Sequence, residues 1–257
     1  MCLLCCSKLN LLNTLDVQDK QMTLFCLPYA GGSKYSYREF ERVAPSFLKI
    51  VTMEYPGRGG RSEERLCTSI PDLLEDLYEQ ILPSLSAGSY ALYGHSMGGL
   101  IAYLLTQKIV RHGETEPQHL FVTGTRGPLS QSNDDRKIYR LNEKDFVEEL
   151  RKLKGCPEEI LNDPDVFEYF APILRADFQA IETFKYNASA PVPVAMTVIT
   201  GTEEDLDEDD ILQWRFETSS TLVFKKFPGH HFFIFQYPLE IIRLVAHTLF
   251  YKNAIDI

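Results

Sequence analysis

The sequence predicts an α/β fold in which a mostly parallel central sheet has helices on both faces and carries a helical lid insertion. Two observations support this prediction. Six short β-prone runs alternate with helical patterns along most of the 257 residues, and the stretch between the fourth and fifth runs contains helical patterns only. Strands that alternate with helices pair in parallel, because each connection crosses one face of the sheet. One α/β core is expected for a chain of this length.

The β-prone runs cover residues 23–27, 50–54, 89–93, 120–123, 194–200 and 221–227. Between them, apolar residues recur at spacings of three and four, which predicts helices over residues 35–45, 70–85, 100–112 and 237–250. In the stretch without strands, helices are expected over residues 142–153 and 163–184, with interruptions at Pro157, Pro164 and Pro172.

These elements predict a core made of residues 23–126 and 189–257, an insertion of residues 127–188, and an N-terminal extension, residues 1–22, that is expected to be poorly ordered. An insertion between parallel strands lies over their carboxyl ends, so this one is interpreted as a lid over a site. Its apolar side chains exceed the needs of one packing face, which indicates either a cavity for a hydrocarbon chain or contacts that only attach the lid to the core. They are Phe146, Val147, Leu150, Leu153, Ile160, Leu161, Val166, Phe167, Phe170, Ile173 and Leu174.

Composition and charge exclude several classes of protein. With 26 basic and 36 acidic residues, a net charge of −10 argues against nucleic acid as a partner. No run approaches the ~20 apolar residues that span a bilayer, and the N-terminus lacks the basic start and cleavage site of a secretory signal. We therefore expect a cytoplasmic protein that binds no membrane.

The six cysteines are an N-terminal trio plus Cys26, Cys67 and Cys156, which lie too far apart in sequence to suggest a disulfide framework or a zinc-ligand pair, so reduced thiols and no metal are expected. Two points stay open at this stage. They are the role of Cys2, Cys5 and Cys6, and whether translation begins at Met1 or at Met22, directly before the first β-prone run.

The third β-prone run continues into a helix through Gly94-His95-Ser96-Met97-Gly98, a Gly-x-Ser-x-Gly pattern. In such a joint the glycines let strand and helix approach closely, and the serine takes a strained conformation that presents its hydroxyl group at the helix N-terminus. Ser96 is therefore predicted to be a nucleophile. The alternative is a glycine-rich turn whose serine only caps the helix.

A serine nucleophile of this kind needs a histidine base, which follows an acid in the chain. His230 and His231 come after the sixth run, on the loop where the last strand delivers a base, and one of them is the predicted base. The other histidines lie within the serine turn, ahead of any acid position, or in the last helix.

The acid is expected on the loop after the fifth run, which reads Gly201-Thr202-Glu203-Glu204-Asp205 and continues into further carboxylates. Asp205 is preferred and Glu204 is the alternative, while most of the others are expected to be solvated or to cap the next helix. An acyl-transfer oxyanion also needs two backbone N–H donors. Met97 supplies one, and Ala30, in the Gly-rich loop after the first run, supplies the other.

Five segments together carry a resemblance to a known family. They are Phe-Cys-Leu-Pro-Tyr-Ala-Gly-Gly at 25–32, Tyr-Pro-Gly-Arg-Gly-Gly-Arg at 55–61, Gly-His-Ser-Met-Gly-Gly at 94–99, Leu-Arg-Ala-Asp-Phe at 174–178 and Gly-His-His-Phe-Phe at 229–233. From about residue 23 to residue 250 the chain resembles the stand-alone type II thioesterases of nonribosomal peptide and polyketide synthases, in the α/β-hydrolase superfamily. The vertebrate medium-chain thioesterases of fatty acid synthase are similar too.

The resemblance implies roles for particular residues. It assigns the base to His231, because the family histidine directly precedes two aromatic residues, and it leaves His230 where the family has glycine or a small polar residue. The family's acid loop reads Gly-x-x-Asp, whereas here the third residue after Gly201 is Glu204 and Asp205 comes one later. Asp205 is favoured on the argument that a one-residue loop insertion disturbs a site less than a longer side chain.

The resemblance also implies an activity: hydrolysis of acyl thioesters on the phosphopantetheine arm of carrier proteins, for editing or for release of intermediates. The substrate carries the phosphopantetheine, so no cofactor is expected. The expected partners are acyl or peptidyl carrier domains, and the protein is expected to be a monomer. Arg58, Arg61 and Arg175 are candidates for contacts with a carrier's phosphate and acidic helix, with structural or surface ion pairs as the alternative.

Other functions stay open from sequence. A medium-chain acyl-carrier or coenzyme A thioesterase, or a small-molecule esterase or acyltransferase, would use the same residues. A non-catalytic binding module of the same fold is disfavoured, because nucleophile, base and oxyanion donors are all present.

Overall fold

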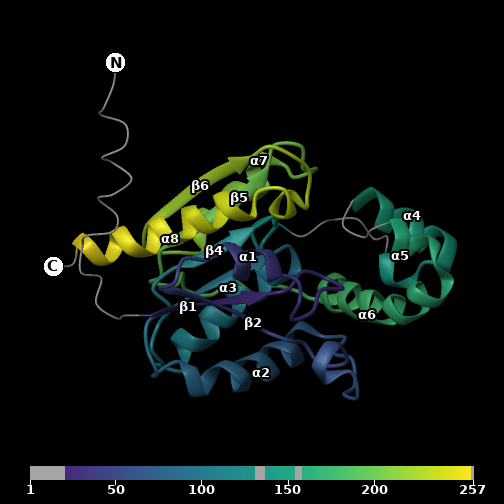
Figure 1. The fold of residues 1–257 in the computed structure, drawn as a ribbon, viewed down its shortest axis with the longest axis horizontal. Helices are drawn as coiled ribbons and strands as arrows, with labels where there is room; N and C mark the ends of the chain where they lie inside the picture. The colour runs from purple at the N-terminus through teal and green to yellow at the C-terminus, as the bar shows by residue number, and fades with distance from the viewer. Residues whose placement is uncertain (1–20, 131–136, 154–157, 256–257) are drawn as a thin grey trace.

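The computed structural model describes residues 21–130, 137–153 and 158–255, and these residues form one six-stranded sheet with helices on both sides (Figure 1). The strands occur in the order β2-β1-β3-β4-β5-β6, and every neighbouring pair is parallel. Their bounds are β1 (Met22–Leu27), β2 (Leu48–Thr52), β3 (Tyr90–His95), β4 (Leu120–Thr123), β5 (Met196–Gly201) and β6 (Leu222–Phe227).

The helices divide between the two faces of the sheet and the insertion. On one face α1 (Arg38–Val43) packs beside α8 (Pro238–Ile255), and on the other α2 (Ile70–Ile81) packs beside α3 (Met97–Arg111). Between β4 and β5 come α4 (Glu143–Leu153), α5 (Glu158–Asn162) and α6 (Pro164–Thr183), which stand off to one side of the sheet (Figure 1). The short α7 (Glu208–Leu212) follows β5.

The core has two layers because neighbouring residues of a strand point to opposite faces. In β1, Leu24 and Cys26 pack toward α1 and α8, whereas Phe25 and Leu27 pack toward α2 and α3. All of them are buried, so the strand has apolar residues on both faces and reads as a continuous apolar run. This burial is why the sequence showed unbroken β-prone runs instead of alternating ones.

The predicted fold class is confirmed by this parallel sheet and by its two helical layers. Each predicted strand overlaps an observed one, and the run at 120–123 coincides with β4. The strand predicted at 50–54 is displaced: β2 begins at Leu48, which pairs with Met22 at the start of β1. The short helix α5 was not predicted.

The expectation that Pro172 interrupts a helix is wrong, because α6 continues through it. A proline inside a helix removes one backbone hydrogen bond, and the buried neighbours Ile173 and Leu174 hold the helix in place by packing. Pro164 lies in the first turn of α6, where no bond is lost, behind an Asp163 cap whose side chain accepts from two backbone N–H groups.

The apolar side chains of the insertion pack mainly on one another. The buried cluster consists of Phe146, Leu150, Leu161, Phe167 and Leu174. A small core of its own therefore accounts for most of the apolar excess seen in the sequence.

Parts of the sequence predictions lie outside the described residues. These include residues 1–20 of the predicted extension with Cys2, Cys5 and Cys6, the position of Pro157, and the side chains of Leu153 and Ile160. Among the residues that the structure does describe, no helix is long and apolar enough to cross a bilayer.

The joint between β3 and α3 is packed without room for a side chain at two glycines. A Cβ atom at Gly94 would lie 2.0 Å from the Gly98 carbonyl oxygen, and one at Gly98 would lie 2.1 Å from the Leu27 carbonyl oxygen. Real Cβ atoms do not approach backbone oxygens this closely, so the backbone of β1 or α3 would have to move. The first turn of α3 is thus pressed against the end of β1.

We predict that Gly94→Ala or Gly98→Ala lowers the free energy of unfolding by about 3 kcal/mol or more, because the added methyl group meets backbone that cannot move aside. Gly88→Ala is the matched control, since nothing lies within 4 Å of a Cβ atom there. It should change stability by less than about 1 kcal/mol in urea denaturation. Equal stability of the two kinds of variant would contradict the tight joint.

Candidate active site

Ser96 lies in the sharp turn between β3 and α3. Its φ of 55° and ψ of −121° make it the non-glycine residue with positive φ in the described part of the chain. The Ser96 N–H donates to the Thr123 carbonyl oxygen at 2.8 Å, and the Ser96 carbonyl oxygen accepts from Gly99 N at 2.9 Å. Such a conformation costs about 1–3 kcal/mol and persists only where the surroundings impose it, as at active sites.

The backbone around Ser96 offers donors for an anion. Met97 is the first residue of the 15-residue helix α3, so its N–H belongs to the group of helix N–H donors that have no acceptor within the helix. The positive end of the helix dipole is directed at the same place. Ser96 thus lies beside a region of positive potential made entirely by backbone.

The loop after β1 forms a tight turn next to this helix N-terminus. Gly32 N donates to the Tyr29 carbonyl oxygen at 2.9 Å, and Gly31 has a φ of 78°, the pattern of a type II turn with Ala30 and Gly31 at its centre. In a trans peptide the C=O and N–H groups point in opposite directions. Because the Tyr29 C=O closes the turn, the Ala30 N–H points away from it. Ala30 and Ser96 line the same pocket.

His231 is paired with a carboxylate, and that carboxylate belongs to Glu204. His231 Nδ1 lies 2.7 Å from Glu204 Oε1, while Glu204 Oε2 accepts from Gly201 N at 2.5 Å. The Glu204 side chain is 2% exposed and that of His231 is 23% exposed. Glu204 is therefore fixed at both oxygens, and it holds the imidazole so that Nε2 is the nitrogen left for other partners.

The preference for Asp205 as the partner of His231 is not supported by this geometry. Thr202 N donates to Phe227 O at 2.8 Å and Glu203 N to Gly229 O at 2.9 Å, so the loops after β5 and β6 continue side by side. This alignment places Glu204 against His231 with no inserted residue. Asp205 is exposed at the pocket wall.

His230 also lines the pocket, and it pairs with a different acid, Glu203. Its Nε2 is 3.0 Å from Glu203 Oε2, and its side chain is 44% exposed. The sequence analysis left the choice between the two histidines to the family resemblance. In the structure His231 is the one that reaches a buried carboxylate, whereas His230 reaches an exposed one.

His95 is a buried neighbour of His231. The ring centroids of the two histidines are 4.9 Å apart, and His95 Nδ1 lies 2.9 Å from Thr123 Oγ1. Burial, and then the nearby His231, lower the pKa of His95 well below its ordinary value of 6.5. His95 is therefore a buried, neutral packing group beside the site.

The pocket around these groups has a volume of about 760 Å³. Ser96, His231 and Glu204 lie in its wall, together with the loop after β1. The insertion supplies an apolar part of the wall, formed by Leu150, Phe170, Leu174, Phe178 and Ile181. Part of the insertion's apolar surface thus faces a cavity, in addition to its own core.

Two of the three arginines considered for partner binding have structural roles. Arg58 is 2% exposed and forms an ion pair with Asp177 of α6. Arg175 donates to the carbonyl oxygens of Tyr139 and Leu141 at 2.9 Å each. The alternative of structural contacts therefore holds for both residues.

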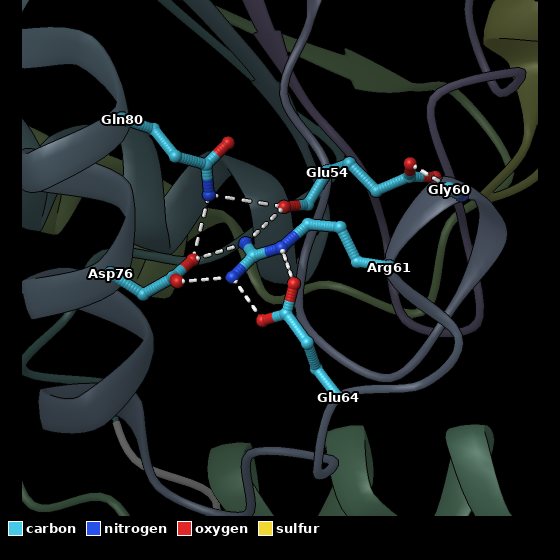
Figure 2. Close-up of polar contacts among 6 residues, drawn as sticks. All are labelled: Glu54, Gly60, Arg61, Glu64, Asp76 and Gln80. Carbon is cyan, nitrogen blue, oxygen red and sulfur yellow. Dashed lines mark hydrogen bonds and ion pairs between the residues drawn. The ribbon is translucent and has the colours of Figure 1, made fainter.

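The third arginine, Arg61, also has partners within the protein, in a hydrogen-bond network beside α2 (Figure 2). It binds Asp76 with two hydrogen bonds of 2.8 and 2.6 Å, contacts Glu64, and donates to the Glu54 carbonyl oxygen at 3.0 Å. Gln80 joins the network through the same Asp76 and Glu54.

In the described ranges, no group of three or more His, Cys, Asp or Glu side chains is arranged to hold a metal ion.

The site and fold can be compared with known proteins. The family model described as a thioesterase domain matches residues 22–249. The gramicidin S biosynthesis protein GrsT of Aneurinibacillus migulanus is 30% identical over 231 residues, which cover 89% of this chain and 89% of GrsT.

Solved structures of similar proteins superpose on this chain over most of its length. ClbQ from the colibactin NRPS/PKS pathway superposes with a TM-score of 0.86 at 29% identity, over 91% of this chain and 99% of ClbQ. YbtT, a type II thioesterase from the yersiniabactin NRPS/PKS pathway, superposes with a TM-score of 0.79 at 26% identity, over 90% of this chain and 93% of YbtT.

The lowered pKa of His95 leads to a prediction about stability. Below about pH 6.5 the unfolded chain protonates this histidine and the native state does not, so stability falls with decreasing pH by up to about 1.4 kcal/mol per pH unit for this one group. Denaturant unfolding between about pH 7 and pH 5 measures the slope. His95→Gln, which cannot titrate, should have a shallower slope, and identical slopes would contradict the neutral assignment.

Proposed function

This chain belongs to the thioesterase family and is a thioester hydrolase, and on that basis we propose that it removes acyl groups from the phosphopantetheine arms of carrier domains in nonribosomal peptide or polyketide synthesis. The observation that carries the proposal is one pocket wall that contains a strained serine, a histidine held by a buried glutamate, and a backbone turn. The names of two relatives support the proposal: GrsT is a gramicidin S biosynthesis protein, and YbtT is a type II thioesterase from an NRPS/PKS biosynthetic pathway.

In the proposed acylation step, Ser96 Oγ attacks the thioester carbonyl carbon and His231 Nε2 takes the hydroxyl proton. The carbonyl oxygen becomes an oxyanion that accepts hydrogen bonds from the N–H groups of Ala30 and Met97. When the intermediate collapses, the C–S bond breaks and the histidine returns its proton to the sulfur. The products are an acyl-serine ester and the free thiol of the carrier arm.

Deacylation repeats the sequence with water. His231 takes a proton from the water, whose oxygen attacks the acyl ester, and then gives that proton to Ser96 Oγ as the carboxylic acid leaves. Glu204 accepts the Nδ1–H bond throughout and stabilises the imidazolium that forms in each half-reaction. Its position three residues after Gly201 matches the acid position of the resembled family, with glutamate in place of aspartate.

The pocket supports an acyl chain as the group transferred. Its wall from the insertion is apolar, and Tyr29 and Phe235 add aromatic rings whose centroids lie 5.6 Å apart. Burial of a hydrocarbon chain against such walls is favourable by about 0.8 kcal/mol for each CH₂ group. The thioester end would then lie at Ser96, with the arm leaving through the opening.

Ser96→Ala tests the proposed nucleophile. We expect it to lower the rate of thioester hydrolysis by about 10³-fold or more, with unchanged folding by circular dichroism, because the covalent step is lost. A variant as fast as the parent enzyme would refute the mechanism.

The proposed substrate is tested by comparing three substrates with the same acyl group: a thioester on an acyl carrier domain, a coenzyme A thioester and a small oxyester. Contacts to the carrier add binding energy that the transition state can use, so kcat/KM should be at least about tenfold higher for the carrier-bound thioester. A preference for the oxyester would favour a small-molecule esterase instead.

The acid is tested by Glu204→Gln and Asp205→Asn side by side. Glu204→Gln removes the charge that orients and stabilises His231 and should lower kcat by about 10²- to 10⁴-fold. Asp205→Asn should lower it by less than about threefold, and Glu204→Asp should retain an intermediate rate because a carboxylate remains. The opposite order would return the role to Asp205.

A further inference from the structure

The carboxylate of Asp177 on α6 joins three segments of the chain. Its Oδ2 accepts from Gly31 N at 2.7 Å and from Arg58 Nη1 at 2.6 Å, and its Oδ1 accepts from Arg58 Nη2 at 2.7 Å. The side chains are 0% and 2% exposed, so the pair is shielded from water. A bidentate pair of this kind is geometrically specific and charge-assisted.

The Gly31 contact fixes the turn that carries the proposed oxyanion donor. The hydrogen bond from Gly32 N to Tyr29 O sets the peptide that contains the Ala30 N–H. The Asp177 bond sets the next peptide through Gly31 N. The two peptides flanking the Ala30 Cα atom are therefore held independently, one by the turn and one by α6.

Arg58 adds a second brace to the same loop. Its Nη1 also reaches the Gly32 carbonyl oxygen at 3.4 Å, and its guanidinium lies 5.2 Å from the ring centroid of Tyr55, whose hydroxyl donates to Pro28 O at 2.8 Å. The loop thus contacts a base formed by Tyr55 and Arg58 of the segment after β2. Asp177 joins that base to α6.

The packing leaves little freedom between α6 and the turn. A Cβ atom at Gly31 would lie 2.5 Å from Leu174 Cδ2, so the turn contacts the helix directly. Leu174 and Phe178, on either side of Asp177 in sequence, line the pocket. One helix therefore supplies both apolar pocket wall and the acceptor for Gly31.

We propose that Asp177 is a positioning residue for the oxyanion hole: with Arg58 as its counter-ion, it holds the Ala30–Gly31 peptide so that the Ala30 N–H is directed at the developing oxyanion. This inference rests on the proposed function. It differs from a purely structural ion pair because it requires the acceptor at Gly31 N, which hydrophobic packing cannot replace.

Asp177→Asn is the first test, since asparagine keeps the shape but has one acceptor oxygen for the three donors, Gly31 N and two Arg58 nitrogens, that the carboxylate now serves. We expect kcat for an acyl-loaded carrier domain to fall about 10- to 100-fold, with KM changed by less than about threefold. The reason is that the hydrogen bond from Ala30 N–H to the oxyanion, which Asp177 positions, acts mainly in the transition state. The inhibition constant of an acyl trifluoromethyl ketone, whose serine adduct carries an oxyanion, should rise by the same factor as the loss in kcat/KM.

The double variant Arg58→Met with Asp177→Leu separates positioning from stability. Replacing a buried ion pair by apolar residues often preserves stability. A folded double variant should be at least as slow as Asp177→Asn, because leucine leaves Gly31 N with no side-chain acceptor. Recovery of parental kcat in the double variant would overturn the proposal, and so would failure of both variants to fold, which would make the pair structural only.

Asp76→Asn is the matched control, because Asp76 also forms a bidentate bond with an arginine, Arg61, away from the turn (Figure 2). It should lower thermal stability while leaving kcat and the inhibition constant unchanged. Parental kcat in a folded Asp177→Asn refutes this inference alone. Absence of Ser96-dependent thioester hydrolysis in the parent enzyme refutes the proposed function instead.

Discussion

The contact of Gly98 with the end of β1 is the constraint on which the site depends. Because a Cβ atom at Gly98 would lie 2.1 Å from Leu27 O and 2.6 Å from Pro28 O, the first turn of α3 lies directly on the start of the loop after β1. That contact sets the distance between the Met97 N–H at the helix end and the turn that contains Ala30. It also holds the neighbouring Ser96 in a conformation with positive φ. This backbone contact therefore sets the start of α3, with Ser96 and Met97, against the loop after β1, while the turn bond and Asp177 orient the Ala30 N–H within that loop.

The other parts of the site are placed by the parallel sheet, whose carboxyl ends collect the loops after β1, β3, β5 and β6. Backbone hydrogen bonds between the last two loops bring Glu204 to His231, and Asp177 ties α6 to the first loop. The insertion thus has three roles. Its apolar side chains form a small core and part of the pocket wall, and Leu174 and Asp177 contact the turn after β1. This combination suits a reaction in which an apolar acyl chain must be held while charge develops at its carbonyl oxygen.

Much of the fold followed from local patterns. Strands buried on both faces read as apolar runs and helices show three-and-four spacing, so the elements and their parallel arrangement were predictable. The serine turn was also visible, because it is a continuous segment whose residue types match a local geometry. The residue pattern left His230 and His231 as alternatives for the base, and the family resemblance selected His231. The continuation of α6 through Pro172 was missed, since tertiary packing overrides the local cost of a proline.

By itself the sequence determined the order of strands and helices, the choice of Ser96 as the predicted nucleophile, and the placement of a base at the end of the last strand. Only the tertiary structure decided which carboxylate meets His231 and which group binds Arg58. Both pairings join segments distant in the chain, 27 residues apart for Glu204 with His231 and 119 for Arg58 with Asp177. The first pairing follows from how the loops after β5 and β6 align, and a one-residue difference in that alignment, which no local pattern encodes, separates Glu204 from Asp205. The second follows from how α6 packs against the loops after β1 and β2.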